Sequence, residues 1–346
     1  MELITYPQTE LEQLRADWQR LEHGAEMTYF QTYEWNRMLL PAIPADNKYF
    51  EALFLAAKQD GEVVMIAPLW VIKRTYRFIH HPMIYIFGNG GWSDYLNFIY
   101  SSFSEEAAAA VMNYLHEHYA DIPLSFSSLK SSSSLYQYIN SHYSLETDTT
   151  GLCVSLALPA TVDEWWSSLS KHSRQNMRTA QNRMSKEGVE YTVNFDDTNV
   201  DKALCIQMRA VRSEMKSHRD EKVKMSKKIK RMVKSAILHI PSRGGYHPIY
   251  DDSGAKIMTL RDNNGELMAY FHYGYDAVHR EIVVLSAGVA KEYERYSPGM
   301  LLMKAYIENA IKDGGIRNID FTRGAEPYKL SLGGKANINH SVSFRI

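Results

Sequence analysis

One segment, residues 281–334, constrains the fold of this 346-residue chain more than any other. It reads as a strand EIVVLSAGVA, the turn YSPG, an apolar helix MLLMKAYIENAIKDGG, a second strand NIDFTRG and the stretch AEPYKLSLGG. A strand that leads into a helix through small residues presents free backbone N–H groups and the positive end of the helix dipole. Pro298 suits the first helical position, and Ser297 is a good capping residue. The segment therefore predicts an anion site, most often one for phosphate.

The backbone at three neighbouring residues is the candidate pyrophosphate site. We expect Ser297, Gly299 and Met300 to hold it through N–H groups, because Gly299 has no side chain and lets a ligand approach closely. An ordinary helix start explains the same residues without a ligand. The S-P-G sequence alone leaves both interpretations open, and the flanking strands favour the anion site.

Composition indicates a folded chain of two domains rather than one. Hydrophobic residues make up 45% and aromatic residues 12%, as in folded soluble proteins. Two cysteines, Cys153 and Cys205, point to a reducing compartment without a disulfide framework. We expect a cytoplasmic protein, because the chain has no signal-peptide pattern and no run of about 18 apolar residues. We expect no metal, because the histidines show no HExxH-type spacing.

The net charge of −1 hides a basic stretch. Between Lys171 and Arg243 there are 18 Lys and Arg against 8 Asp and Glu, an excess of +10 that leaves −11 for the remainder. Such a stretch suits a polyanion such as tRNA, a charged membrane or the phosphates of a cofactor. It also suits a solvated helical face, because KMSKKIKRMVKSAILHI places Met225, Ile229 and Ile240 on one side with lysines opposite.

The order of the elements predicts an α+β or α/β fold with mixed sheets. From Val189 onward we expect β, α, α, β, β, β, α, β, α, β, with one parallel crossover through the helix that contains Met300. The first half reads as helices, then mainly antiparallel strands, then a helix and a strand. A new unit begins near residue 151, so we predict domains at 1–150 and 151–346.

Three stretches of this chain resemble one family of acyltransferases. They are FQTYEW with IAPLWV, the basic helix SKHSRQNMRTAQNRM, and YSPGMLLMKAYIENAIKDGGIRNIDFTRGAEPYKLSLGG. They resemble segments of the CelD/BcsL-like acetyltransferases of cellulose and exopolysaccharide biosynthesis, a branch of the GNAT superfamily that is related to the FemABX transferases. The resemblance covers nearly the whole chain. It implies tandem GNAT-like domains with mixed, mainly antiparallel sheets flanked by helices, and an acyl-CoA site in the C-terminal domain.

The resemblance also implies an activity. It is acyl-CoA-dependent N-acylation, with acetyl-CoA or another acyl-CoA as co-substrate and an amine of an exopolysaccharide or cell-envelope precursor, such as an amino sugar, as acceptor. In such a fold two strands splay apart around the donor, which would lie beside Leu285 and Ala287. Asp320 is then the candidate general base and Tyr328 the candidate acid for the leaving thiolate. A structural ion pair of Asp320 and a core role for Tyr328 are the competing interpretations.

Candidate acceptor contacts come from several parts of the chain. Arg174 and Arg178 share a helix face at a spacing that suits a phosphate or carboxylate clamp, or a solvated face. Trp92, Asp94 and Tyr95 suit a carbohydrate groove, because such sites favour aromatic rings paired with carboxylates. The other candidates are Arg323, Glu326, Lys329 and the strand histidine His272.

Two further functions stay open at this point. The basic stretch suits a FemABX-like aminoacyl transferase that uses aminoacyl-tRNA, although only about 40 residues separate Val200 from Ile240, too few for that group's paired-helix arm. A catalytically inert tandem-GNAT scaffold in an envelope assembly is the third hypothesis. None of the three involves DNA.

Overall fold

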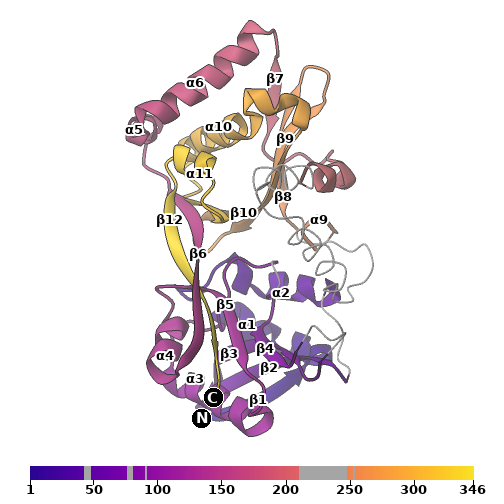
Figure 1. Cartoon of the computed structure of the whole chain (residues 1–346), viewed down its shortest axis with the longest axis vertical. Helices are drawn as coiled ribbons and strands as arrows, with labels where there is room; N and C mark the ends of the chain where they lie inside the picture. Colours follow the sequence, from indigo (N-terminus) through magenta and orange to yellow (C-terminus); the bar gives the residue numbers. More distant parts are fainter. Residues whose placement is uncertain (43–47, 76–80, 90–91, 210–247, 252–253) are drawn as a thin grey trace, which may run out of the picture. The chain divides into compact units, whose positions relative to one another are not determined.

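Figure 1 shows the computed structural model of the chain, which describes residues 1–42, 48–75, 81–89, 92–209, 248–251 and 254–346. The described residues form two compact units. Unit 1 consists of residues 1–152 and 337–346, and unit 2 of residues 153–209 and 249–336. Two strands, β6 (Leu145–Ala157) and β12 (Lys335–Phe344), contain residues of both units. The C-terminal segment, which the sequence assigned to the second domain, thus folds with unit 1.

Unit 1 has a mixed sheet with the strand order β1-β2-β3-β4-β5-β12. Its strands besides β12 are β1 (Glu2–Pro7), β2 (Phe50–Gln59), β3 (Glu62–Ile72), β4 (Met83–Ile86) and β5 (Leu124–Lys130). Its described helices are η1 (Gln8–Leu14), α1 (Arg15–Leu21), η2 (Tyr29–Gln31), α2 (Tyr33–Leu39), η3 (Leu40–Ala42), α3 (Glu105–Tyr119) and α4 (Ser134–His142). Neighbouring strands are antiparallel except β4 and β5, which are parallel and are joined through α3.

Unit 2 has the strand order β6-β11-β10-β9-β8-β7. Its strands besides β6 are β7 (Tyr191–Asn194), β8 (Lys256–Asp262), β9 (Leu267–Asp276), β10 (Glu281–Val289) and β11 (Asn318–Arg323). Its described helices are α5 (Val162–Ser168), α6 (Lys171–Lys186), residues 202–209, α9 (Pro248–Asp251), η4 (Lys291–Tyr296), α10 (Pro298–Asp313) and α11 (Pro327–Ser331). Again only one neighbouring pair, β10 and β11, is parallel, and α10 joins its strands.

The two units repeat one pattern of strands. Counted from β1 in unit 1 and from β7 in unit 2, three antiparallel pairings are followed by one parallel and one antiparallel pairing. The sixth strand of each sheet comes from the other half of the chain, since β12 pairs with β5 and β6 pairs with β11. The pairing of β5 with β12 and the pairing of β11 with β6 are both irregular beside a residue of positive φ. That residue is Ser128 at 58° in β5 and Thr322 at 56° in β11. The predicted mixed sheets and the parallel crossover through the Met300 helix are confirmed.

Local sequence explains where α10 begins and ends. Pro298 occupies the first helical position, as predicted, and Gly314 follows the last turn with the left-handed φ of 70° that glycine favours. Ser297 departs from the prediction, because its φ is 52° and its side chain makes no capping hydrogen bond. Leu302 and Ile307 lie fully buried in the core of unit 2, where burial of such side chains contributes about 1.5–3 kcal/mol each. Apolar packing therefore fixes α10 against the sheet, and side-chain capping does not.

Further expectations concern membrane-spanning helices, metal sites, the cysteines and the basic stretch. No helix among the described residues is long and apolar enough to cross a membrane. Within the same residues, no cluster of three His, Cys, Asp or Glu side chains is placed to hold a metal ion. Cys153 and Cys205 are buried free thiols. Residues 210–243 of the basic stretch, including the helix expected at 225–240, lie outside the described residues.

Gly288 in β10 permits a close approach that any side chain would block. A Cβ at this position would lie 2.4 Å from Cε1 of Tyr270 and 2.9 Å from Cβ of Met208. We expect Gly288→Ala to lower the free energy of unfolding by about 1–3 kcal/mol, measured by urea denaturation. Gly151→Ala is the matched control, since a Cβ added at Gly151 would have no atom within 4 Å besides those of its chain neighbours. Equal losses in the two variants would contradict the packing role of Gly288.

Candidate active site

The parallel strands β10 and β11 separate soon after they begin to pair. Their register starts at Glu281 and Asn318 and stops at Val283 and Asp320, although β10 continues to Val289. On its other edge β10 stays paired with β9 as far as Val289. The edge of β10 beyond Val283 therefore makes no ladder with β11, and an extended ligand can pair with it by strand addition.

Two hydrogen bonds hold β11 at the point of separation. Thr322 has a φ of 56°, in the left-handed region that favours glycine. Oδ1 of Asp320 accepts the N–H of Thr322 at 2.6 Å, and the Thr322 hydroxyl donates to the carbonyl of Val284 at 2.9 Å. Both side chains are buried. These bonds offset a left-handed backbone that costs about 1–2 kcal/mol. They put Asp320 at the point where β10 and β11 separate, which we call the fork.

β10 carries a bulge directly beyond the fork. The β9–β10 register shifts between Val284 and Ser286, so Leu285 has no partner residue on β9. Ser286 lies opposite His272, and both are buried, with 6% and 3% of their surface exposed. Ala287, the other predicted donor contact, is partly buried on the same strand. A bulged residue turns its N–H out of the ladder, which is the type of group that stabilises a developing oxyanion.

The start of α10 is more closely bonded than the sequence predicted. The N–H of Ser297 donates to the Glu294 carbonyl at 3.0 Å, and the N–H of Met300 donates to the Ser297 carbonyl at 3.0 Å. Of the three residues of the predicted pyrophosphate site, Gly299 is the one whose N–H has no backbone acceptor among the described residues. A Cβ on Gly299 would lie 3.2 Å from Cγ2 of Val289, so its missing side chain also serves the packing of α10 on β10.

Lys329 has a structural environment rather than the substrate-binding one that the sequence predicted. It is 3% exposed, and its Nζ donates to the carbonyls of Arg323 at 2.7 Å and Gly324 at 2.9 Å. The same Nζ pairs with a carboxylate oxygen of Glu326 at 2.9 Å. The Nζ also donates to the carbonyl of Thr322 at 3.5 Å, so three carbonyls accept its three hydrogens. These contacts correct the prediction for Lys329 and Glu326, which together hold the turn between β11 and α11; Arg323 enters it through its carbonyl.

Tyr328 lies at the start of α11 and is partly buried. Its ring centroid lies 6.5 Å from that of Phe271 and 6.4 Å from that of Phe321. The ring therefore packs on β9 and β11 in the way that the core interpretation predicted. This packing fixes the direction of the phenol and is compatible with a role as proton donor.

A buried hydroxyl cluster beside the bulge had no signal in the sequence. The hydroxyl of Tyr250 lies 2.9 Å from that of Tyr270 and 2.7 Å from Oγ of Ser286. Tyr270 donates to the carbonyl of Cys205 at 2.8 Å. Burial, and next the nearby Tyr250, raise the pKa of Tyr270 above its ordinary value, and burial raises the pKa of Cys205 to about 12. The cluster thus lines the bulge with neutral hydrogen-bonding groups.

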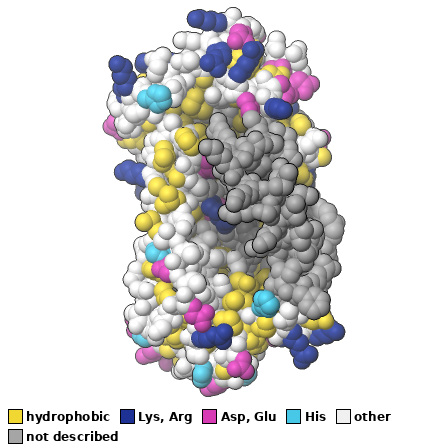
Figure 2. Space-filling view, viewed as in Figure 1, with side chains coloured by type: hydrophobic (Ala, Val, Ile, Leu, Met, Phe, Trp, Pro, Cys, Tyr) yellow, Lys and Arg dark blue, Asp and Glu magenta, His cyan; other side chains and the backbone are white. Residues whose placement is uncertain are grey.

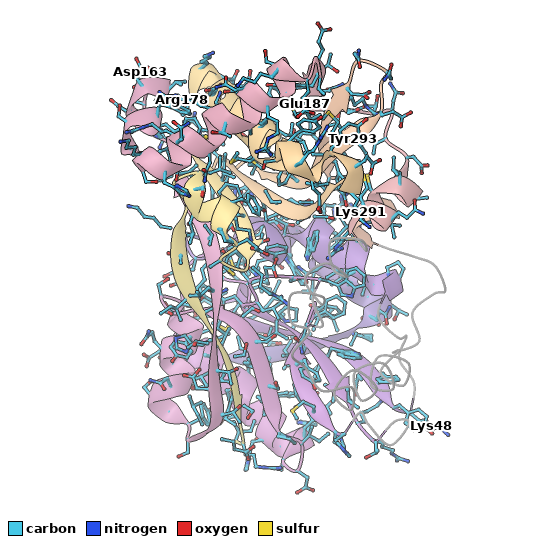
Figure 3. The ribbon with its side chains drawn as sticks, turned by 45° about the horizontal axis from the view of Figure 1, so that its top comes forward. Lys48, Asp163, Arg178, Glu187, Lys291 and Tyr293 are labelled. Atoms are coloured by element: carbon cyan, nitrogen blue, oxygen red, sulfur yellow. The ribbon has the colours of Figure 1, made fainter. Side chains whose placement is uncertain are left out.

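The two arginines of the predicted clamp, Arg174 and Arg178, make contacts with α5 and the residue that follows it. Arg174 donates to carbonyls at the end of α5, among them that of Leu169 at 2.9 Å. The guanidinium of Arg178, labelled on α6 in Figure 3, lies 5.7 Å from the ring centroid of Trp166. Trp92 and Asp94 belong to unit 1. The predicted residues that unit 2 does gather lie on β9, β10, β11 and the starts of α10 and α11: His272, Leu285, Ala287, Ser297, Gly299, Met300, Asp320 and Tyr328.

Unit 1 offers a helix start that is equivalent to that of α10 but differs in charge. The hydroxyl of Ser104 accepts the N–H of Ala107 at 3.2 Å and caps α3. Glu105 and Glu106 follow in the first turn. These carboxylates repel a phosphate, whereas the first turn of α10 contains no acidic residue. Of the two equivalent helix starts, the one in unit 2 suits a phosphate.

Residues 171–330 match the family model described as "Acetyltransferase (GNAT) domain". This span runs from the start of α6 to α11 and includes the fork between β10 and β11. The chain thus contains a GNAT-type acetyltransferase domain. The GNAT fold generally implies an acyl-CoA co-substrate, and the match confirms the predicted enzyme class. No curated protein matches the sequence.

Two solved structures resemble the whole chain. A crystal structure of FemX has a TM-score of 0.63 at 11% identity, and the alignment covers 100% of this chain and 98% of that one. The C-terminal domain of a putative lysylphosphatidylglycerol synthetase from Agrobacterium fabrum has a TM-score of 0.50 at 11% identity and covers 97% and 92%. At these identities the likeness shows a shared fold and nothing about substrates.

The bonds of Lys329 predict a large effect on stability. We expect Lys329→Met to lower the free energy of unfolding by about 2–4 kcal/mol, because it leaves two part-buried carbonyls without their donor and the Glu326 carboxylate without its counter-charge. Lys312→Met, at an exposed position in the last turn of α10, should change it by less than about 0.5 kcal/mol. Urea denaturation of both variants measures the difference. A stable Lys329→Met protein would make Lys329 a candidate substrate ligand again.

Proposed function

We propose that unit 2 transfers an acyl group, with acetyl as the concrete case, from acyl-CoA to an amine. The observation that carries this proposal is the separation of β10 from β11 beside the start of α10. Acyl-CoA has an extended amide-containing arm that can complete the sheet along β10, and a pyrophosphate that suits a positive helix end. Both features lie in the part of the chain that matches the GNAT domain.

The donor would contact three places in this arrangement. Its amides would pair with β10 beyond Val283, near Leu285 and Ala287. Its pyrophosphate would accept from the N–H of Gly299, with Ser297 and Met300 as flanking backbone. Its thioester oxygen would accept from the N–H of Leu285, which stabilises the oxyanion of a tetrahedral intermediate.

Two side chains are proposed to move the protons. The attacking amine forms the new N–C bond and gives its proton to the carboxylate of Asp320, directly or through one water. The C–S bond then breaks, and the hydroxyl of Tyr328 protonates the leaving thiolate. The position of Asp320 at the last paired register of β10 and β11 supports this assignment.

The acceptor follows from the family resemblance rather than from the geometry. An amino sugar of an exopolysaccharide or cell-envelope precursor is the proposed acceptor, with His272 as a candidate contact in unit 2. Aminoacyl transfer from tRNA is the alternative, since the fold is shared with FemX and the basic stretch of the sequence suits a polyanion. On the face drawn in Figure 2, Lys and Arg of the described residues are interspersed with Asp and Glu and form no continuous basic surface. A steep, salt-dependent affinity for tRNA would favour the alternative.

Ser297 permits a sharp test of the pyrophosphate site. It is exposed, and its left-handed backbone is one that Asp and Asn tolerate. We expect Ser297→Asp to weaken the binding of CoA by about tenfold or more, because it puts a carboxylate where the phosphates accept hydrogen bonds. Ser297→Asn, whose side chain has the shape of Asp without its charge, should bind CoA within about threefold of wild type. Isothermal titration calorimetry measures both affinities.

The variants Ser297→Asp and Ser297→Asn also test the inert-scaffold hypothesis. Ser297→Asp should not destabilise the protein, because a negative charge at a helix start is favourable by about 0.3–1 kcal/mol. Equal CoA affinities in the two folded variants would exclude the proposed pyrophosphate site. A wild-type protein that does not bind CoA would favour the scaffold.

Asp320→Asn separates the catalytic from the structural role of this carboxylate. The amide oxygen of Asn can still accept the N–H of Thr322, while the basic charge is lost. We expect kcat to fall by about 100-fold or more with CoA affinity unchanged. Steady-state kinetics and a melting curve check this. Near-wild-type turnover with a lower melting temperature would show that Asp320 only holds the left-handed backbone at Thr322.

A further inference from the structure

Unit 1 contains a polar cavity that the proposed reaction does not use. Its volume is about 100 Å³, enough for several water molecules or a small organic group. It lies where the loop before η2, the segment that begins at Tyr95 and the turn after β5 meet. Its lining residues are Ala25, Glu26, Thr28, Gln31, Tyr95, Leu96, Asn97, Lys130, Ser132 and Ser133.

Two opposite charges line this cavity. Nζ of Lys130 lies 4.6 Å from the ring centroid of Tyr95, and Lys130 pairs with no carboxylate among the described residues. An ammonium over a ring directs only some of its three N–H groups at the ring face, so the rest stay available to a ligand. Glu26 provides the negative charge, and it accepts the hydroxyl of Tyr100 at 2.7 Å, the N–H of Ser134 at 2.8 Å and the hydroxyl of Ser134.

A buried hydroxyl in the lining is poorly hydrogen-bonded. Ser133 is 4% exposed, and its Oγ makes no well-formed hydrogen bond to a described residue, although it lies near enough to the Tyr100 hydroxyl to oppose the rise in pKa that burial gives that group. Buried polar groups are rarely left in this state, because desolvation without a hydrogen bond is unfavourable. The hydroxyl therefore points to a ligand atom that accepts or donates at this position.

The ring of Tyr95 argues against a stacked sugar. Lys130 lies over it, and the ring of Phe30 lies beside it with centroids 6.0 Å apart. Carbohydrate recognition by an aromatic side chain needs an open ring face. Recognition in this cavity must therefore rest on charge and hydrogen bonds.

We propose that the cavity binds a small zwitterion of the amino-acid type. Its carboxylate accepts from Lys130 and Ser133, and its ammonium donates to Glu26. A ligand with both charges contacts the two side chains at once, whereas a ligand with one charge contacts only one of them. The proposal is independent of the acyl transfer proposed for unit 2.

The test uses the full chain and isothermal titration calorimetry. L-alanine should bind saturably. N-acetyl-L-alanine, which lacks the ammonium, and L-alaninamide, which lacks the carboxylate, should each bind at least about tenfold more weakly. Methyl glucoside should not bind. These comparisons need no variant, so a folding defect cannot obscure them.

Two lysines form a matched pair of variants. Lys48, labelled in Figure 3, also lies over a tyrosine ring, with Nζ 4.9 Å from the centroid of Tyr49, but it does not line the cavity. Lys130→Met should weaken the binding of L-alanine by about tenfold or more, and Lys48→Met should leave it unchanged. Ser133→Ala should weaken it by a smaller factor.

Three outcomes would overturn the proposal. They are the absence of saturable binding of L-alanine to the wild-type chain, equal affinities for L-alanine and its two singly charged derivatives, and tighter binding of methyl glucoside. Unchanged affinity in a folded Lys130→Met protein would also overturn it. CoA binding to unit 2, measured in the same samples, is expected to be unaffected in every case.

Discussion

The separation of β10 from β11 is the constraint on which the proposed chemistry depends. Two parallel strands that start in register would continue to pair unless something stopped them. Here the left-handed backbone of Thr322 stops them, and the bonds from its N–H to Asp320 and from its hydroxyl to Val284 hold it. The same carboxylate is the candidate base. The geometry that opens the sheet thus also places a titratable group at the opening.

The repeated strand pattern shows how two similar units can serve different purposes. Both have a parallel pair joined by a helix and an irregular strand with a positive φ, at Ser128 and Thr322. They differ in the first turn of the helix that joins the pair. Glu105 and Glu106 occupy the start of α3, whereas α10 begins with Pro298 and Gly299 and no acid. A few residues at one helix start therefore make one unit suitable for a phosphate and the other unsuitable.

Local signals explain which elements could be predicted from the sequence. The bounds of α10 follow from Pro298, Gly314 and an apolar period between them, and the crossover follows from a helix between two apolar strands. Partners of β6 and β12 could not be predicted, because alternating residues specify a buried face and not the neighbour that buries it. The contact of Tyr250 with Ser286 could not be predicted for the same reason, since it joins positions that only the folded sheet brings together.

Basic side chains illustrate the limit of site prediction from residue type. Arg174 and Lys329 were candidate anion ligands because they are cations near the expected site. In the structure their donors go to backbone carbonyls at the end of α5 and in the turn after β11. Such carbonyls need donors wherever a helix ends or a strand turns in the interior, and long cationic side chains supply them. Recognition of an anion in unit 2 would then rest on the backbone N–H of Gly299. Every residue except proline carries such a group, so the type of residue alone does not reveal which N–H binds an anion.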